Sequence, residues 1–227
     1  MKRDVQFYQI SDRALTVSFG NVISEEINRK VTALAEAVGK KPFPGFQESV
    51  PAFSSLTVFY DLKKVRDSFP ESETAFAAVR RQMENLLERL ETGGPSQTRL
   101  VEIEFSCDQR SALDLEQAAA SKNLSPEEFI EIFTSRVYRV FMLGFLPGFA
   151  YMGEVDPRIA VGRKEQPRKS VPAGSVGIAG SQTGIYPLDS PGGWQIIGRT
   201  DVRLFTPENS EPTFLKPGDS VKFTACR

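Results

Sequence analysis

The residues best suited to acid–base chemistry are two glutamates, Glu102 and Glu104, which alternate with apolar neighbours. Residues two apart on a strand share a face, so their carboxylates can interact and their pKa values can separate, as an acid and base pair requires. Glutamate is far more often simply solvated on the outer face of a strand, and we favour that interpretation. The sequence therefore identifies no catalytic residue.

The chain of 227 residues contains no histidine. Ser-His-Asp and Cys-His catalysis, histidine-ligated zinc and the two-histidine iron site are therefore excluded within this chain. Its two cysteines, Cys107 and Cys226, are too few for a four-thiolate site. Cys107 has no histidine to activate it, and we interpret it as structural. We expect no metal site, and any acid or base must be a carboxylate, Lys, Tyr, Cys or water.

The charges are balanced, with 28 basic and 29 acidic residues giving a net charge of −1. Such a chain gives no reason to expect nucleic-acid binding. No window approaches the roughly 18 apolar residues of a membrane span. The first residues alternate in polarity, which is unlike a signal peptide. We expect no membrane association and a cytoplasmic location, where both thiols stay reduced.

The clearest break in the pattern is Gly93-Gly94-Pro95. It follows an amphipathic helical stripe over residues 76–90 and precedes the alternating run 101–105, which has the period of a strand. We expect a domain boundary at about residue 94, with one domain over residues 1–94 and a second over residues 95–227.

The first domain is predicted to be an α+β domain with two helices on a small, mainly antiparallel sheet. Ser24, followed by two glutamates, indicates the start of the first helix, which we expect to end at Gly39. We see no reactive cluster here and favour a structural or partner-binding module. Strands are expected near residues 5–7, 15–19, 48–53 and 56–60.

The second domain is predicted to be mainly β with two helices. Asp114 begins one helix, and Ser125-Pro126-Glu127-Glu128 begins the next with a capping box and a proline at its first position. An extended run follows over residues 137–143. Eleven of the 17 glycines fall between Gly144 and Gly198, which indicates short strands and tight turns, as in a barrel or sandwich.

The known phosphate-binding and nucleophile motifs are absent. The sequence contains neither a P-loop nor a G-x-G-x-x-G dinucleotide fingerprint. The G-x-S-x-G nucleophile elbow is also missing. If this chain handles ATP, it does so through a site that these motifs do not describe.

Four segments, in order, resemble the signature of the KipI/PxpB family. That family comprises the B subunit of prokaryotic 5-oxoprolinase, the sporulation-kinase inhibitor KipI, and the related domain of allophanate hydrolase subunit 1 and urea amidolyase. The segments are residues 141–151 (FMLGFLPGFAY), 167–168 (PR), 171–187 (VPAGSVGIAGSQTGIYP) and 190–200 (SPGGWQIIGRT).

The resemblance implies an α+β domain followed by a cyclophilin-like β-barrel domain. It also implies a non-autonomous component of a cyclic amide hydrolase that opens 5-oxo-L-proline to L-glutamate, with PxpA-like and PxpC-like partner subunits. ATP, with magnesium, would be used at the level of that complex, and no nucleotide site is identified within this chain.

Within the signature, the resemblance points to residues for such a substrate. A carboxylate calls for a guanidinium, and a cyclic amide calls for amide or hydroxyl groups. An apolar wall would come from Phe145, Tyr151 and Trp194. For each of the two residues Arg199 and Trp194, a purely structural role is an equal alternative. The candidate substrate-binding residues are Arg168, Gln182, Thr183, Tyr186, Trp194 and Arg199.

Two other functions share the same signature. One is a KipI-like inhibitor that binds a sensor histidine kinase. The other is a component of an allophanate-related or urea-related amidohydrolase or carboxylase system. We prefer the oxoprolinase interpretation, since a concentrated set of Arg, Gln, Tyr and Trp suits a pocket better than a broad protein interface.

One position departs from the family pattern. Many relatives, as the resemblance suggests, carry histidine near the end of the helix that Ser125 opens, where this chain has Phe133. If that histidine serves chemistry in relatives, this chain does without it. If it only packs, phenylalanine is a harmless substitute.

Overall fold

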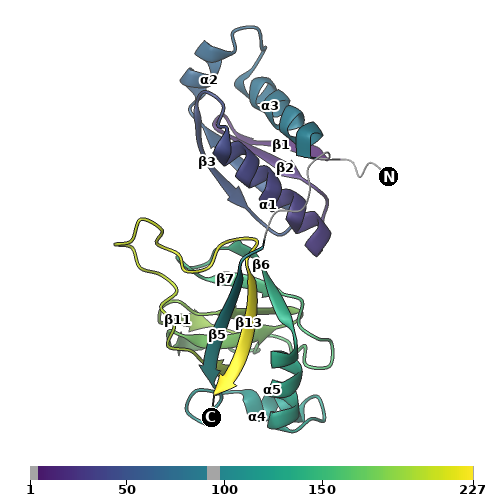
Figure 1. The fold of residues 1–227 in the computed structure, drawn as a ribbon, viewed down its shortest axis with the longest axis vertical. Coiled ribbons are helices and arrows are strands. Elements are labelled where there is room, and N and C mark those ends of the chain that lie inside the picture. Colours follow the sequence, from purple (N-terminus) through teal and green to yellow (C-terminus); the bar gives the residue numbers. More distant parts are fainter. Residues whose placement is uncertain (1–4, 91–97, 227) are drawn as a thin grey trace. The chain divides into compact units, whose positions relative to one another are not determined.

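The structure, a computed structural model, describes residues 5–90 and 98–226, which form two compact units divided between Gln97 and Thr98. Figure 1 shows a unit of helices on a sheet and a unit built around a barrel. The expected boundary at about residue 94 lies outside the described residues. No helix in the described residues is long and apolar enough to cross a membrane.

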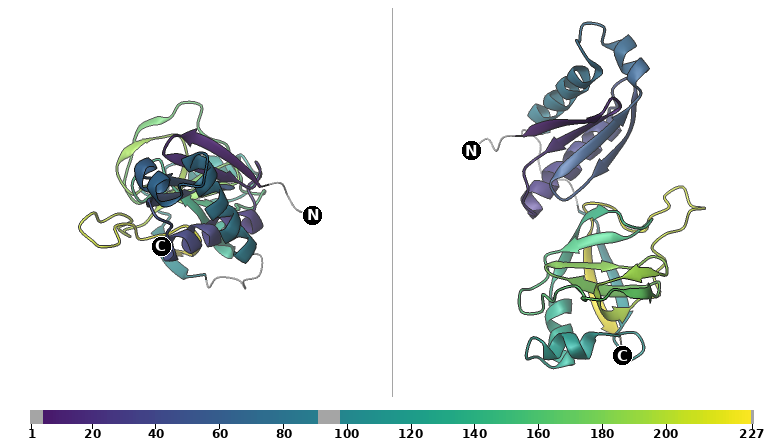
Figure 2. Two further views of the ribbon diagram at one scale, coloured as in Figure 1. Left: turned by 90° about the horizontal axis from the view of Figure 1, so that it is seen from above. Right: turned by 180° about the vertical axis from the view of Figure 1, so that it is seen from behind.

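The first unit has one antiparallel four-stranded sheet with the order β1-β2-β4-β3. Helices α1 and α3 lie on one face of it, as Figure 2 shows from behind. A third helix, α2, was not expected; the Asp61 side chain begins it by accepting a hydrogen bond from the backbone N–H of Lys64 at 2.9 Å. The elements are β1 (Gln6–Ser11), β2 (Ala14–Ser18), α1 (Glu25–Lys40), β3 (Phe46–Pro51), β4 (Ser55–Tyr60), α2 (Leu62–Ser68) and α3 (Ala75–Leu90).

Helix α1 forms for the reasons that its sequence indicates. Ser24 caps it by accepting a hydrogen bond from the backbone N–H of Ile27, and the two glutamates of the first turn suit the positive end of the helix dipole. The helix ends at Lys40, one residue beyond the expected glycine. Its buried face carries Ile27, Asn28, Val31, Thr32, Leu34 and Val38.

Tyr60 leads to a testable prediction about this first core. Its ring is fully buried, and its hydroxyl has no hydrogen-bond partner among the described residues. A buried donor without a partner costs about 1–3 kcal/mol, so Tyr60→Phe is expected to raise the free energy of unfolding by about 1 kcal/mol. Tyr138→Phe is the matched control of opposite sign, because the Tyr138 hydroxyl donates to the Phe133 carbonyl at 2.8 Å. Urea unfolding of both variants measures the difference; a loss of stability in Tyr60→Phe would contradict it.

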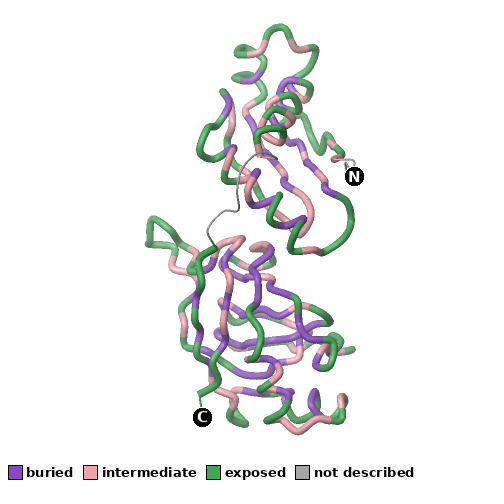
Figure 3. Tube along the Cα trace, turned by 45° about the vertical axis from the view of Figure 1, so that its right-hand side comes forward, coloured by how far each residue is buried: buried purple, intermediate pink, exposed green. Residues whose placement is uncertain are grey.

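The second unit is a closed seven-stranded barrel with the strand order β10-β7-β6-β13-β5-β12-β9, beside a two-stranded sheet of β8 and β11. Figure 3 shows the buried segments along the barrel strands. The expected mainly-β barrel with two helices is therefore confirmed. Its elements are β5 (Leu100–Ser106), α4 (Leu115–Ala120), α5 (Pro126–Ser135), β6 (Val137–Leu143), β7 (Ala150–Gly153), β8 (Arg168–Val171), β9 (Ser175–Ala179), β10 (Gln182–Ile185), β11 (Ser190–Gly192), β12 (Gln195–Arg199) and β13 (Ser220–Cys226).

Strands β5 and β13 run parallel to each other and complete the barrel. Val101, Ile103 and Phe105 of β5 are buried, whereas Leu100, Glu102 and Glu104 are exposed. Glu102 pairs in register with Lys222 on β13. The two glutamates therefore lie on the solvent face of the strand, as the simpler interpretation predicted.

Helix α5 has the capping box that its sequence predicted. The Ser125 hydroxyl accepts from the Glu128 backbone, and the Glu128 carboxylate accepts from the Ser125 backbone N–H. Near its end, the fully buried Phe133 ring packs against Phe105, Tyr138 and Phe223 at centroid distances of 5.0–5.7 Å. In this chain Phe133 therefore packs in the hydrophobic core of the barrel unit.

Candidate functional site

A second apolar cluster in the barrel unit is built mainly from aromatic rings. Phe149 lies at its centre, with ring centroids 4.8 Å from Tyr151, 5.3 Å from Tyr186 and 5.5 Å from Trp194. Three of these rings are buried, and Tyr151 is partly exposed. Because edge-to-face packing fixes the rings against one another, the cluster forms a rigid apolar wall.

Close backbone approach explains part of the glycine density around this cluster. A Cβ atom at Gly192 would lie 2.4 Å from the Tyr186 hydroxyl oxygen. At Gly177 it would lie 3.1 Å from the Trp194 Cβ. These two glycines let neighbouring strands lie directly against the aromatic rings, so they serve the wall rather than turns alone.

Phe145 stands at the edge of the cluster in an unusual conformation. Its φ of +68° is rare for a bulky residue, and the residue is 61% exposed. The ring meets Phe149 edge-on at 5.6 Å. Strained, exposed residues of this kind are found disproportionately at binding sites, so the loop between β6 and β7 belongs to the candidate site.

Beside the aromatic cluster lies a buried carboxylate, Asp114, that joins three distant segments. Arg168 donates to both of its carboxylate oxygens at 2.7 Å, and the Lys164 ammonium donates at 2.8 Å. The backbone N–H of Ile196 donates at 2.8 Å. The side chain of Asp114 is 2% exposed, and those of its two cationic partners are about a quarter exposed. One carboxylate thus holds two cations, and the cluster keeps one net positive charge.

The electrostatics of this cluster follow from its contacts. Burial alone would raise the pKa of Asp114, but the hydrogen bonds from Arg168, Lys164 and Ile196 outweigh it and hold that pKa below its ordinary value. The hydrogen bonds with Asp114 raise the pKa of Arg168. Asp114 and Arg168 are therefore both charged at neutral pH.

The structure brings three of the six candidate residues together. Arg168 on β8 lies close enough to Tyr186 for an electrostatic interaction, and the Trp194 backbone hydrogen-bonds to Tyr186. Burial raises the pKa of Tyr186, so its hydroxyl stays protonated at neutral pH. These residues, together with Asp114, form the candidate site.

The other three candidates lie elsewhere on the barrel. The Thr183 hydroxyl is fully buried and donates to the Gly177 carbonyl at 2.9 Å. Arg199 is exposed, and its Nε donates to the Ala173 carbonyl at 2.9 Å. Gln182, which is partly exposed, pairs with the last residue of β9, whereas Arg199 pairs with its first. Gln182 on β10 and Arg199 on β12 therefore lie beside opposite ends of β9.

The sequence interpretation missed the roles of Asp114 and Lys164. The pattern predicts only a helix start at Asp114, and α4 does follow it, but the Asp114 side chain makes no capping hydrogen bond. The available signal was the concentration of cations between Arg163 and Lys169, which calls for a buried acid. Nothing local identified Asp114 as that acid.

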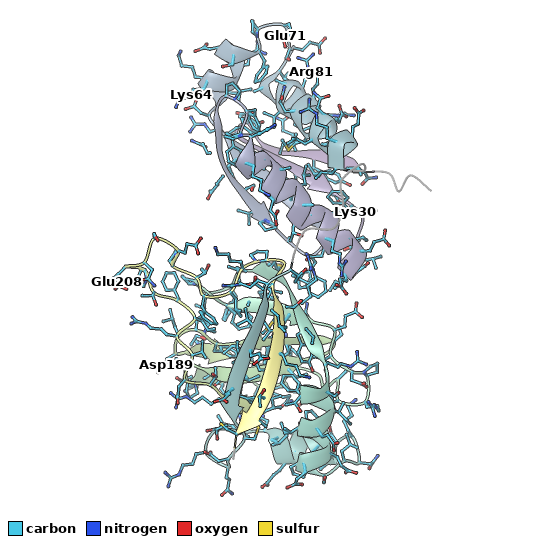
Figure 4. All side chains as sticks on the ribbon, in the orientation of Figure 1. Lys30, Lys64, Glu71, Arg81, Asp189 and Glu208 are labelled. Atoms are coloured by element: carbon cyan, nitrogen blue, oxygen red, sulfur yellow. The ribbon has the colours of Figure 1, made fainter. Side chains whose placement is uncertain are left out.

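Two further residues, Cys107 and Asp189, have structural surroundings. Burial, followed by the charges of Cys226 and Asp108, raises the pKa of Cys107 to about 12, so its thiol is a weak nucleophile at neutral pH. Asp189, labelled in Figure 4, accepts a hydrogen bond from the backbone N–H of Ala173 at 2.7 Å and holds a turn. Among residues 5–90 and 98–226, no group of three acidic, cysteine or histidine residues could hold a metal ion.

Comparison with known proteins places this barrel and its companion unit in a family. The model for the carboxyltransferase domain, subdomain C and D, matches residues 5–215. The chain is 47% identical to the 5-oxoprolinase B subunit of Bacillus subtilis, covering 96% of this chain and 91% of that relative. It is 37% identical to the 5-oxoprolinase B subunit of Escherichia coli, with 95% and 94% covered.

A solved structure agrees in fold. The crystal structure of TTHA0988 superposes with a TM-score of 0.81 at 37% identity. The match covers 95% of this chain but only 40% of that longer one. From the family model and these relatives, the chain belongs to the carboxyltransferase subdomain C and D family, which it shares with the B subunits of bacterial 5-oxoprolinases.

Proposed function

We propose that this chain is the B subunit of an ATP-dependent 5-oxoprolinase complex, which opens 5-oxo-L-proline to L-glutamate with PxpA-like and PxpC-like partners. The observation that carries the proposal is the 47% identity to a 5-oxoprolinase B subunit across nearly the whole of both chains. We place ATP and magnesium at the level of the complex, and we assign this chain no nucleotide-binding residue.

The charge and the exposed aromatic side chains of the candidate site suit this substrate. 5-Oxoproline carries one carboxylate and one small ring. The net positive charge left on the cluster of Asp114, Lys164 and Arg168 attracts the carboxylate. Asp114 occupies two N–H groups of Arg168, and the guanidinium has five, so donors remain for a second anion. The partly exposed Tyr151 and the exposed Phe145 offer the ring an apolar surface.

The part that this chain plays in the proposed reaction is binding and orientation. Opening a lactam needs a nucleophile and an acid for the leaving nitrogen. The carboxylate of the site, Asp114, is fully engaged with its two cations, and the Tyr186 hydroxyl stays protonated. We therefore assign bond breaking to a site completed by the partner subunits, with this chain holding the substrate carboxylate.

Reconstitution tests the proposal. Mixed with the PxpA-like and PxpC-like subunits, 5-oxoproline, ATP and magnesium, this chain is expected to give glutamate, ADP and phosphate, because only the complete complex contains every group that the reaction needs. Glutamate is measured by amino-acid analysis. Mixtures lacking this chain or ATP are the controls. Equal glutamate formation with and without this chain would contradict the proposal.

A further inference from the structure

A groove in the barrel unit lies between helix α4 and the segment 160–163, with a volume of about 340 Å³. This is within the lower range of pockets that take small molecules. One wall comes from α4 and the residues just after it, and the other from the segment 160–163 with Gln195. We call it the α4 groove.

The lining of the α4 groove is polar and positively charged. Lys122 extends from the α4 side, and Arg163 from the opposite segment. Neither forms an ion pair within the described part of the chain, and no carboxylate lines the groove. Two amide side chains, Gln117 and Gln195, complete the polar lining. Two cations without a carboxylate partner favour the binding of an anion. The amides add hydrogen-bond donors and acceptors for the polar groups of that anion.

The two walls of the α4 groove are held together before any ligand binds. Asp114, which precedes α4, exchanges two hydrogen bonds with Ile196: its backbone N–H donates to the Ile196 carbonyl at 2.8 Å, and its carboxylate accepts from the Ile196 N–H. On the other wall, Gln195 Nε2 donates to the Gly162 carbonyl at 3.2 Å, and Lys164 N–H donates to the Gly193 carbonyl at 2.7 Å. Both walls are thus hydrogen-bonded to residues at the start of β12. A ligand would therefore bind a groove that is already formed, with little loss of conformational entropy.

Arg163 also connects the groove to the aromatic cluster. Burial raises the pKa values of Tyr151 and Tyr186, and the positive charge of Arg163 acts on both of them in the opposite direction. The charge of Arg163 is therefore felt at both hydroxyls.

We infer that the α4 groove binds a small organic carboxylate, with Lys122 and Arg163 pairing the carboxylate and the two glutamines contacting the ligand's amide or amine. The volume is ample for an amino acid or a cyclic amide acid. The choice of these ligands rests on the proposed function, but the groove lies wholly within this chain, so its binding is measured without partner subunits.

Titration calorimetry on the full chain alone tests this site. The probes are L-glutamate, 5-oxo-L-proline and inorganic phosphate, each in the same buffer at low salt. We expect saturable binding of at least one of the two carboxylates, with affinity that falls as salt is added. Phosphate is expected to bind more weakly than the better carboxylate, because it cannot use the two amides in the same way.

Paired variants identify the residues. Lys122→Gln with Arg163→Gln is expected to weaken carboxylate binding by at least about tenfold. Arg110→Gln with Arg203→Gln is the matched control, because it removes two exposed positive charges outside the groove lining and is expected to leave binding unchanged. Thermal unfolding of both double variants checks that the fold is retained.

Three outcomes would overturn the inference. They are no saturable binding of either carboxylate, equal weakening by both double variants, and phosphate binding as tightly as the carboxylates. Failure here with successful reconstitution would remove the groove but keep the proposed function. Carboxylate binding in the groove together with failed reconstitution would support the groove and contradict the proposed function.

Discussion

Asp114→Ala is expected to lower the free energy of unfolding by about 3 kcal/mol, because it leaves Arg168 and Lys164 without their shared buried counter-ion. The Ile196 N–H loses its acceptor as well. Urea unfolding of the full chain, followed by circular dichroism, measures the change.

Two variants separate charge from contact. Glu116→Ala removes an exposed carboxylate from the same helix and is expected to change stability by less than about 0.5 kcal/mol. Asp114→Asn keeps the side-chain volume and an acceptor for Ile196 but loses the charge, so an intermediate loss is expected. Equal stability of Asp114→Ala and Glu116→Ala would show that the buried cluster contributes nothing.

The pH dependence of this cluster has a defined sign. The folded-state pKa of Asp114 lies below its ordinary value of 3.8. Its ionised form therefore stabilises the fold fully above pH 3.8, and that contribution is lost as pH falls through the lower folded-state pKa. The stability difference between the parent chain and Asp114→Ala should accordingly be constant near neutrality and shrink in strong acid.

Phe133→Ala is expected to lower the free energy of unfolding by about 4 kcal/mol, because it empties the centre of a closely packed aromatic cluster. The ring is fully buried in contact with Phe105, Tyr138 and Phe223, so its neighbours have little freedom to close the cavity. Urea unfolding again gives the measurement.

Phe145→Ala is the matched control for that change. It removes the same atoms from a residue that is 61% exposed, so the expected loss is below about 1 kcal/mol. If the two substitutions cost the same, the packing account of Phe133 is wrong. The size of the Phe133 effect also shows how much of the stability of the barrel depends on the position where related sequences are expected to carry histidine.

Elements with short-range causes were predictable from the sequence. The α5 capping box depends on Ser125 and Glu128, three residues apart, and the burial of β5 depends on simple alternation. Helix α2 was missed because a helix of about two turns leaves too little periodicity to recognise, although Asp61 was a usable cap signal.

The candidate site was predictable only in part, because its key contacts span the sequence. The family resemblance assigns Arg168 to a substrate carboxylate, but its strongest partner is Asp114, 54 positions away. Ile196 lies 82 positions from the same carboxylate. No local pattern carries such a pairing, and the burial that distinguishes Asp114 from an ordinary helix cap exists only after the barrel has formed.

The parallel pairing of β5 with β13 also constrains how this protein folds during synthesis. All strands of the first unit come from residues 6–60, so its sheet can form early. The barrel joins Leu100 to Ser220, and β5 lies between β12 and β13 in the closed order. One side of β5 therefore has no neighbour until β13 has left the ribosome. During that interval an unpaired strand edge is exposed, and the second unit depends on long-range closure that is slow and prone to aggregation.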